Sequence, residues 1–119
     1  MITVILAHKH HGEIERVGIA GNEAFLVKDE ADNRFPYLSE LSTVDLDAFD
    51  KSDMNGIIIE LERLKANLND AEQSHVEDVL RLARKCRESD ECILLFTPFG
   101  ELTGKINTVT TDLEIQKVA

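Results

Sequence analysis

Apolar residues recur at helical spacing in two adjacent stretches of the chain, and this pattern predicts a pair of helices. The first stripe predicts a helix over residues 53–68 and consists of Met54, Ile57, Ile58, Leu61, Leu64 and Leu68. The second predicts a helix over residues 71–88 and consists of Val76, Val79, Leu80, Ala83 and Cys86. Because only a short connection separates the two stretches, we expect an antiparallel helical hairpin.

Polar residues that can cap a helix precede both stretches. The candidate N-caps are Asp50 or Ser52 for the first helix and Asn69 or Asp70 for the second. Asp70 and Gln73 also have the spacing of a capping box. Gly56 is the weak point of the first helix, since glycine in a helix interior costs about 1 kcal/mol relative to alanine.

Shorter apolar runs at the start of the chain favour strands. Residues 2–7 are rich in β-branched side chains and predict a strand that is buried on both faces. After a turn that ends at Gly12, residues 13–19 can form a second strand. The tight-turn signal at 21–23 then leads to a third predicted strand over residues 24–29. We therefore expect the chain to begin as a β-meander.

Two further runs follow the predicted hairpin. Residues 91–96 predict a strand that Pro98 ends, and residues 105–118 alternate in a way that predicts one or two antiparallel edge strands. The expected fold class is α+β, with an antiparallel sheet of about four to five strands packed against an α-helical hairpin. At 119 residues, the length predicts a single domain over residues 1–119.

Residues 29–52 form a polar connector between the predicted meander and the hairpin. Pro36 disfavours helix at Phe35, and scattered large apolar side chains suggest that the core holds the segment at intervals. We expect an ordered loop with one short helical turn. Long ordered loops in small domains often carry function.

Charge narrows the classes of partner. The net charge is −10, from 23 acids against 13 bases, which argues against nucleic acid as a direct ligand and allows a basic protein. Between residues 29 and 53 only Arg34 and Lys51 are basic, against eight acids: Asp29, Glu30, Asp32, Glu40, Asp45, Asp47, Asp50 and Asp53. The chain also lacks a predicted membrane span and a secretory signal, so we expect a cytoplasmic protein.

Candidate metal ligands form two groups. His8, His10 and His11 follow the first strand, where alternate side chains share a face, but the chain offers only His75 as a further histidine. They could also titrate near neutral pH at an interface with a partner. The spacing of Asp45, Asp47, Asp50 and Asp53 is reminiscent of a cation loop, although it lacks the glycine and glutamate of an EF-hand. A solvated strand end or turn is the favoured interpretation of the histidines, and a solvated acidic rim that of the aspartates, so we expect no metal or other cofactor.

Motifs for catalysis are missing from the sequence. There is no G-x-S-x-G elbow and no glycine loop for phosphate, and carboxylate pairs carry no information among 23 acids. The spacing of Cys86 and Cys92 matches no common metal or redox motif, so we expect two buried thiols. The sequence therefore predicts a protein that is not an enzyme.

Aromatic residues gather in the acidic connector. Of the six in the chain, Phe35, Tyr37 and Phe49 lie there. Aromatic side chains among carboxylates suit contact with a basic, partly apolar protein surface. The two phenylalanines can equally anchor the connector to the core, whereas Tyr37, which follows Pro36, is the better candidate for exposure.

One segment resembles a known group of proteins. The chain has an FP-x-L motif, then an Asp and a Phe, then M-x-x-I-I-x-E-L-E-x-L, formed by Phe35, Pro36, Leu38, Leu41, Asp47, Phe49, Met54, Ile57, Ile58, Glu60, Leu61, Glu62 and Leu64. This pattern resembles small bacterial proteins that include immunity proteins of polymorphic and contact-dependent growth inhibition toxin systems. The resemblance implies a small, acidic, cytoplasmic protein that neutralises a toxin by binding it.

Together these features predict an inhibitor that occludes a basic, nuclease-like toxin domain. The expected partner-binding residues are Asp32, Tyr37, Glu40, Asp45, Asp47, Asp50 and Asp53. Two alternatives stay open at this point. One is a small metal-binding protein or enzyme that uses the N-terminal histidines, and the other is an accessory subunit that binds its partner through the helical hairpin.

Overall fold

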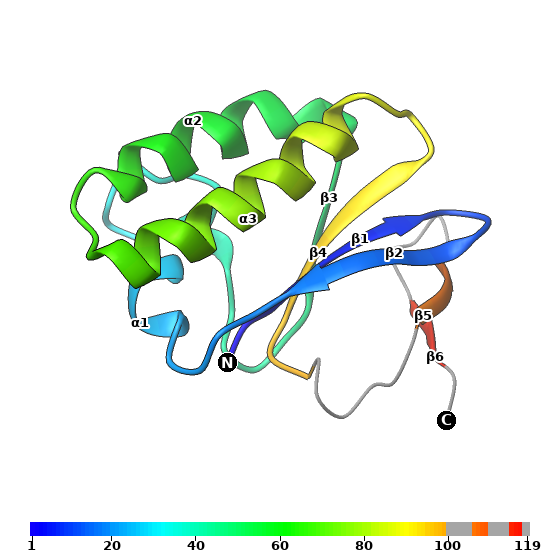
Figure 1. Cartoon of the computed structure of the whole chain (residues 1–119), viewed down its shortest axis with the longest axis horizontal. Coiled ribbons are helices and arrows are strands. Elements are labelled where there is room, and N and C mark those ends of the chain that lie inside the picture. The colour runs from blue at the N-terminus through cyan, green and yellow to red at the C-terminus, as the bar shows by residue number, and fades with distance from the viewer. Residues whose placement is uncertain (100–105, 110–114, 118–119) are drawn as a thin grey trace.

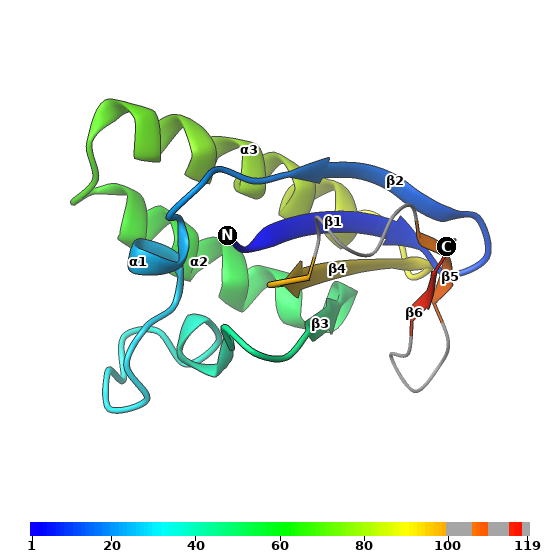
Figure 2. The same cartoon turned by 90° about the horizontal axis from the view of Figure 1, so that it is seen from below.

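The computed structural model describes residues 1–99 and the backbone of residues 106–109 and 115–117. Its centre is a four-stranded antiparallel sheet in the order β2-β1-β4-β3. The strands are β1 (Thr3–His8), β2 (Gly12–Val17), β3 (Asp47–Asp50) and β4 (Cys92–Thr97). Two contacting helices, α2 (Met54–Lys65) and α3 (Asp70–Arg87), cover one face of this sheet (Figures 1 and 2). The α+β fold class and the helical hairpin are therefore confirmed.

The two central strands are apolar on both faces. Val4 and Leu6 of β1 lie opposite Phe96 and Leu94 of β4, and all four belong to the core shared with the helices. The alternate residues form a second buried cluster on the other face, which consists of Ile5, Ala7, Ile93 and Leu95. The predicted double burial of the first strand is confirmed. This arrangement explains the nearly continuous apolar runs, since residues of both parities are buried.

The predicted strand over residues 24–29 is wrong. Residues Glu23–Leu26 form the short helix α1, which follows a turn at Gly21 with φ of +79°. Phe25 and Leu26 are adjacent in sequence, yet both are buried in the same core. A strand would turn them to opposite faces, so one helical turn is the conformation that buries both. The first quarter of the chain is thus a β-hairpin followed by a helical turn.

The connector contains more structure than its sequence suggests. A 3₁₀ turn over Leu38–Glu40, named η1, supplies the short helical turn that we expected. Strand β3 was not predicted, because it has only four residues and carries an acid at each end. Phe49 turns inward from it and contacts Phe96 edge-on, with ring centroids 5.8 Å apart. Pairing with β4, far along the chain, therefore makes this segment a strand.

Both helices begin with reciprocal capping hydrogen bonds. Asp50 caps the 3₁₀ turn η2 (Lys51–Asp53), which continues directly into α2. Asn69 caps α3, as predicted, but its partner in the capping box is Glu72, so the predicted pairing of Asp70 with Gln73 is wrong. At the other end of α3, Arg84, Lys85 and Arg87 lie in the last turn, where positive charge favours the helix dipole.

The end of the chain departs partly from expectation. Within residues 105–118, β5 (Ile106–Val109) and β6 (Ile115–Lys117) pair antiparallel with each other. They form a separate two-stranded sheet, so their predicted place at the edge of the main sheet is wrong. β5 lies near β1 and β2. The remainder of residues 105–118 falls outside the described residues.

The two cysteines are buried and unpaired with each other, as predicted. Burial raises the pKa of the Cys86 thiol to about 12, so it stays protonated and unreactive at neutral pH.

In the described part of the chain, no helix combines the length and apolar character that crossing a bilayer requires.

Candidate protein-binding site

A buried carboxylate fixes the connector onto helix α2. Glu60 is only 3% exposed, and its carboxylate lies against the backbone at the start of η1. The backbone N–H of Tyr37 donates to both of its oxygens at 3.0 Å, and the N–H of Leu38 donates to Oε1 at 2.9 Å. These bonds satisfy donors that would otherwise be buried without partners. Glu60 therefore determines where Tyr37 lies.

The ring of Tyr37 packs on α2 at a glycine. A Cβ atom at Gly56 would lie 2.3 Å from Cε2 and 3.0 Å from Cδ2 of that ring, closer than two carbons can approach. The ring also meets Phe49 edge-on, with centroids 5.8 Å apart. Tyr37 is consequently half-buried, more enclosed than the sequence suggested. The helix-weakening Gly56 has a purpose, since it makes room for this ring.

Three acidic groups lie around Tyr37. Burial raises the pKa of the Tyr37 hydroxyl, and the carboxylates of Asp53, Glu60 and Glu40 raise it further. A surface pocket of about 370 Å³ opens here, lined by Pro36, Tyr37 and Glu40. The structure thus brings together three of the predicted partner-binding residues, which we call the Tyr37 site: Tyr37, Glu40 and Asp53.

Asp50 is tied to this site through the helix cap. Its Oδ1 accepts hydrogen bonds from the Ser52 N–H at 2.9 Å and the Ser52 hydroxyl at 2.5 Å, while the Asp50 N–H donates to Asp53 Oδ2 at 3.2 Å. The hydrogen bonds from Ser52 lower the pKa of Asp50. Both carboxylates therefore have a structural role as caps, and Asp53 also contributes negative charge next to Tyr37.

Asp45 and Asp47 lie at the opposite end of β3 from Asp50. Asp45 is exposed, whereas Asp47 is half-buried and accepts a hydrogen bond from the Ser42 N–H at 3.0 Å. Burial raises the pKa of Asp47, the Ser42 bond opposes that shift, and the charge of Asp45 adds to it. This pair forms a second, separate acidic region at the other end of the edge strand β3.

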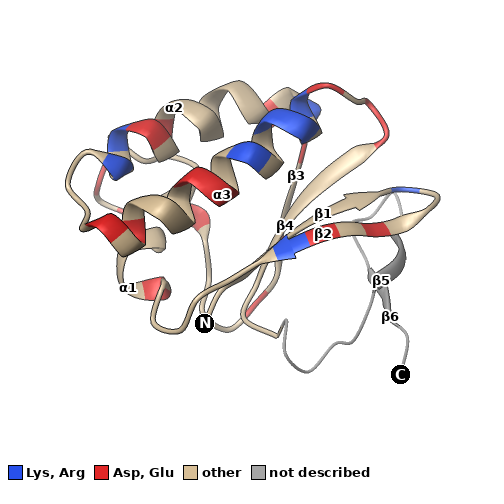
Figure 3. Cartoon of the chain, viewed as in Figure 1, with Lys and Arg blue, Asp and Glu red and all other residues tan. Residues whose placement is uncertain are grey.

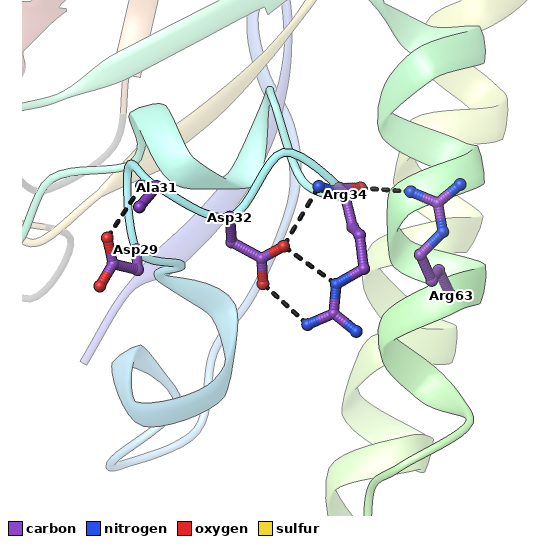
Figure 4. A network of polar contacts seen from close by, with 5 residues as sticks. All are labelled: Asp29, Ala31, Asp32, Arg34 and Arg63. Carbon is purple, nitrogen blue, oxygen red and sulfur yellow. Dashed lines mark hydrogen bonds and ion pairs between the residues drawn. The ribbon is translucent and has the colours of Figure 1, made fainter.

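Asp32 lies in different surroundings from the other predicted residues. Figure 4 shows its carboxylate held by Arg34, with Nε to Oδ1 at 3.0 Å and Nη2 to Oδ2 at 2.9 Å. The Arg34 guanidinium lowers the pKa of Asp32 to about 2. Arg63 reaches the same loop and donates to the Arg34 carbonyl (Figure 4). The charge of Asp32 is thus neutralised locally, and this residue adds little to an acidic surface.

Bases on the two long helices are largely engaged in ion pairs. Arg84 pairs with Glu62 at 2.7 Å, and Arg81 and Lys85 of α3 both reach Glu15 on β2, at 2.5 and 3.3 Å. Lys65 pairs with Glu77 across the hairpin. Figure 3 shows the resulting mixture of blue and red along α2 and α3. The hairpin surface therefore presents a balanced pattern of charge.

The N-terminal histidines cluster at the tip of the β1–β2 hairpin. The rings of His8 and His11 lie 4.4 Å apart, and His8 Nδ1 accepts a hydrogen bond from the His10 N–H at 3.0 Å. His10 Nε2 lies 3.1 Å from Glu91. Within the residues that the structure describes, no three or more His, Cys, Asp or Glu side chains are arranged to hold a metal ion. Nothing in the described part of the chain therefore supports the metal hypothesis.

His75 is far from that hairpin tip and belongs to the core. Its Nε2 lies 3.0 Å from the Asn22 Nδ2, while Asn22 holds the N–H and C=O of Ile2 at 2.6 and 2.7 Å. The two bonds to Ile2 fix the orientation of the amide, so His75 must accept and be neutral. Burial accordingly lowers the pKa of His75. This histidine fixes α1 against the start of β1.

Comparison with known proteins returned no matching family model, no matching curated protein and no matching solved structure. The functional argument accordingly depends on the geometry of the chain itself.

Proposed function

We propose that this protein is a stoichiometric inhibitor of the immunity type, which binds and occludes a basic, nuclease-like toxin domain in the cytoplasm. The observation that carries the proposal is the Tyr37 site, where an aromatic ring on a fixed backbone is surrounded by carboxylates. An aromatic side chain held in one position contributes binding area at little entropic cost. Carboxylates around it select for a cationic partner.

The ion pairs of the chain support this assignment. Among the described residues, Asp32 is the only acid between residues 29 and 53 that forms an ion pair. Most bases of the helices, by contrast, are already paired with acids of the same protein: Lys65, Arg81, Arg84 and Lys85. Most of the described acids that form no ion pair therefore lie along the connector and β3, and a basic surface would gain most by docking there.

Different acids contribute to binding in different ways. Glu40 is exposed and takes no part in capping, so it is free to form a direct contact with a partner. Asp50 and Asp53 exchange capping hydrogen bonds, and a cation that displaced these bonds would weaken the start of α2. We expect the two capping carboxylates to act mainly through their electrostatic field, which accelerates association with a cationic partner and weakens as salt is added.

Charge reversal at Glu40 tests the proposal. The wild-type chain and the Glu40→Lys variant are each co-expressed with a basic nuclease toxin domain that the wild type binds in a pull-down, and survival and affinity are measured. Reversing a charge at a binding surface should cost roughly 2 kcal/mol or more, which is about thirtyfold in affinity. We expect the wild type to protect the cells and the variant to fail.

Glu88→Lys is the matched control, because Glu88 is also exposed and the substitution changes the net charge equally. It should bind like the wild type. Equal weakening by both substitutions would show that only net charge matters, and it would remove the Tyr37 site from the interface. A wild-type chain that neither binds nor neutralises the toxin would refute the inhibitor function.

A further inference from the structure

We propose that the pocket lined by Pro36, Tyr37 and Glu40 receives an arginine side chain of the partner. This inference deepens the proposed function and rests on it, since it names the group that the Tyr37 site recognises. The pocket has a volume of about 370 Å³ and opens beside the Tyr37 ring. Its chemistry, rigidity and charge each favour a guanidinium as the occupant.

The chemistry of the lining combines a ring face with a carboxylate. A guanidinium is planar, so it can stack on the Tyr37 ring while its N–H fork reaches Glu40. An ammonium group is a compact point charge, so it would make one of these two contacts well but would not make both at once. The mixed lining therefore favours arginine over lysine. An acidic side chain would be repelled by Glu40 and by the neighbouring Asp53.

Rigidity favours a specific occupant over a loose one. The backbone at Tyr37 and Leu38 is held by Glu60, and the ring is held between α2 at Gly56 and Phe49. The receiving surface is therefore formed before the partner arrives. Less conformational freedom is lost on binding, which increases the affinity gained from each contact.

Among the described residues, no cationic side chain lines the pocket. Three cations lie instead around the nearby ring of Phe35: Lys28, Arg34 and Arg63. Arg34 is further engaged by Asp32, and Arg63 by the Arg34 carbonyl. Glu40 forms no ion pair within the described residues, so it is available to a cation from outside.

An NMR titration of the protein alone tests the pocket without the toxin. Amide shifts of the labelled chain are followed as N-acetyl-arginine amide is added, and N-acetyl-lysine amide and N-acetyl-glutamate amide are added to separate samples at equal ionic strength. We expect saturable shifts at Tyr37, Leu38 and Glu40 with the arginine probe. Affinity for the lysine probe should be about two- to fivefold lower, the range expected from losing the stacked cation–π contact, and the glutamate probe should not bind.

Two variants test the assignment to these side chains. Glu40→Gln keeps the shape of the pocket and removes its charge, so the arginine shifts should lose saturation, whereas Glu88→Gln should leave them unchanged. Tyr37→Leu should also remove the response, and the dispersion of the same spectra shows whether the variant is folded. Shifts that are absent, equal for the arginine and lysine probes, or spread over all acidic residues would overturn the proposal.

The outcome separates the pocket from the proposed function. If the arginine probe does not bind while the protein still neutralises the toxin, the arginine pocket is wrong and the inhibitor function stands. If the probe binds specifically but no toxin is neutralised, the pocket stands and the inhibitor function is wrong.

Discussion

Phe35 and Tyr37 are two residues apart, and their electrostatic surroundings are opposite. Phe35 is 4% exposed, and cations lie near its ring: Lys28 at 4.9 Å, Arg34 at 5.5 Å and Arg63 at 6.0 Å from the centroid. Tyr37 is half-buried among the carboxylates of Glu60, Asp53 and Glu40. Pro36 separates the two, so the polarity of the connector reverses within a few residues.

This contrast shows that the overall charge is a poor description of the proposed binding surface. The chain carries a net charge of −10, and by composition the whole connector is acidic. Around Phe35, however, the acid Asp32 is bound to Arg34, and that part of the connector serves to hold the loop on α2. Around Tyr37 the carboxylates form no ion pair with a cation of the residues that the structure describes. The proposed recognition of a basic partner is therefore assigned to the second part.

Of the changes considered, removing Glu60 should disturb the Tyr37 side of the connector most strongly. In Glu60→Ala the N–H groups of Tyr37 and Leu38 lose their acceptor in a buried position. Each unsatisfied buried donor costs about 1–3 kcal/mol, so for two donors we expect a loss of about 2–6 kcal/mol in the free energy of unfolding. Denaturant unfolding measures this loss. Glu62→Ala, which changes an exposed acid on the same helix, should cost less than about 1 kcal/mol.

A side chain at position 56 should displace Tyr37 while leaving the Phe35 side intact. Gly56→Ala adds a Cβ that would lie 2.3 Å from the ring. Helix propensity favours the alanine by about 1 kcal/mol, but overpacking costs about 1–3 kcal/mol, so we expect a net loss of up to about 2 kcal/mol.

The sign of this effect should reverse when the ring is absent. In a Tyr37→Ala background, Gly56→Ala should stabilise the chain by about 1 kcal/mol, because only the helix propensity remains. A destabilising effect in both backgrounds would show that the ring is not what position 56 accommodates. Denaturant unfolding of the four proteins in this cycle gives the answer.

Titration of Tyr37 should report the carboxylates around it directly. It is the single tyrosine of the chain, so phenolate absorbance follows it alone. Its pKa is raised in the folded protein, so stability should fall as the pH rises above the unfolded value of about 10. Asp53→Asn should lower this pKa more than Glu40→Gln, and Glu88→Gln should not change it. An unchanged pKa in Asp53→Asn would place that carboxylate away from the hydroxyl.

The smallest change in stability is expected from Arg34→Gln, which alters the surroundings of Phe35. Loss of the guanidinium should let the pKa of Asp32 rise from about 2 toward its ordinary value near 3.9. In the wild type this low pKa stabilises the fold above that ordinary value, and the contribution is lost as the pH falls toward 2; the variant should lack it. Since the pair is exposed, the change in stability at neutral pH should be slight.

Asp47 should change the stability of the fold with pH in the opposite direction to Asp32. Its pKa is raised by burial, so its protonation as the pH falls favours the folded chain. Carboxyl shifts followed by NMR across acidic pH should therefore show Asp47 titrating well before Asp32. The reverse order would contradict the assigned surroundings of both groups.

Helical periodicity predicted the hairpin well because each helix carries its own pattern. The same pattern contained a signal that was missed. Glu60 is three residues after Ile57 and four before Leu64, so it lies on the apolar stripe, where a carboxylate must find buried donors. Gly56 was a second signal, since glycine inside a helix can mark a close approach. Both residues position Tyr37.

Other features depend on partners distant in sequence and could not be predicted locally. β3 becomes a strand by pairing with β4, and α1 is fixed by the contact of Asn22 with His75 and Ile2. For the same reason, composition could not divide the predicted partner-binding residues. The structure gathers Tyr37, Glu40 and Asp53, with Asp50 adjacent, and keeps Asp45 and Asp47 at the other end of β3. It removes Asp32 from that surface by pairing it with Arg34.

The junction of β3 with α2 also bears on how the molecule behaves at high concentration. β3 is an edge strand, and its last outward N–H, at Asp50, is bound by the Asp53 side chain. Because backbone groups alternate in direction along a strand, Ala48 is then the one residue within β3, among those described, that directs an unengaged N–H outward. β3 also carries an acid at each end, Asp47 and Asp50, whose charges would repel those of a second copy, so we expect this edge to resist the addition of a further strand.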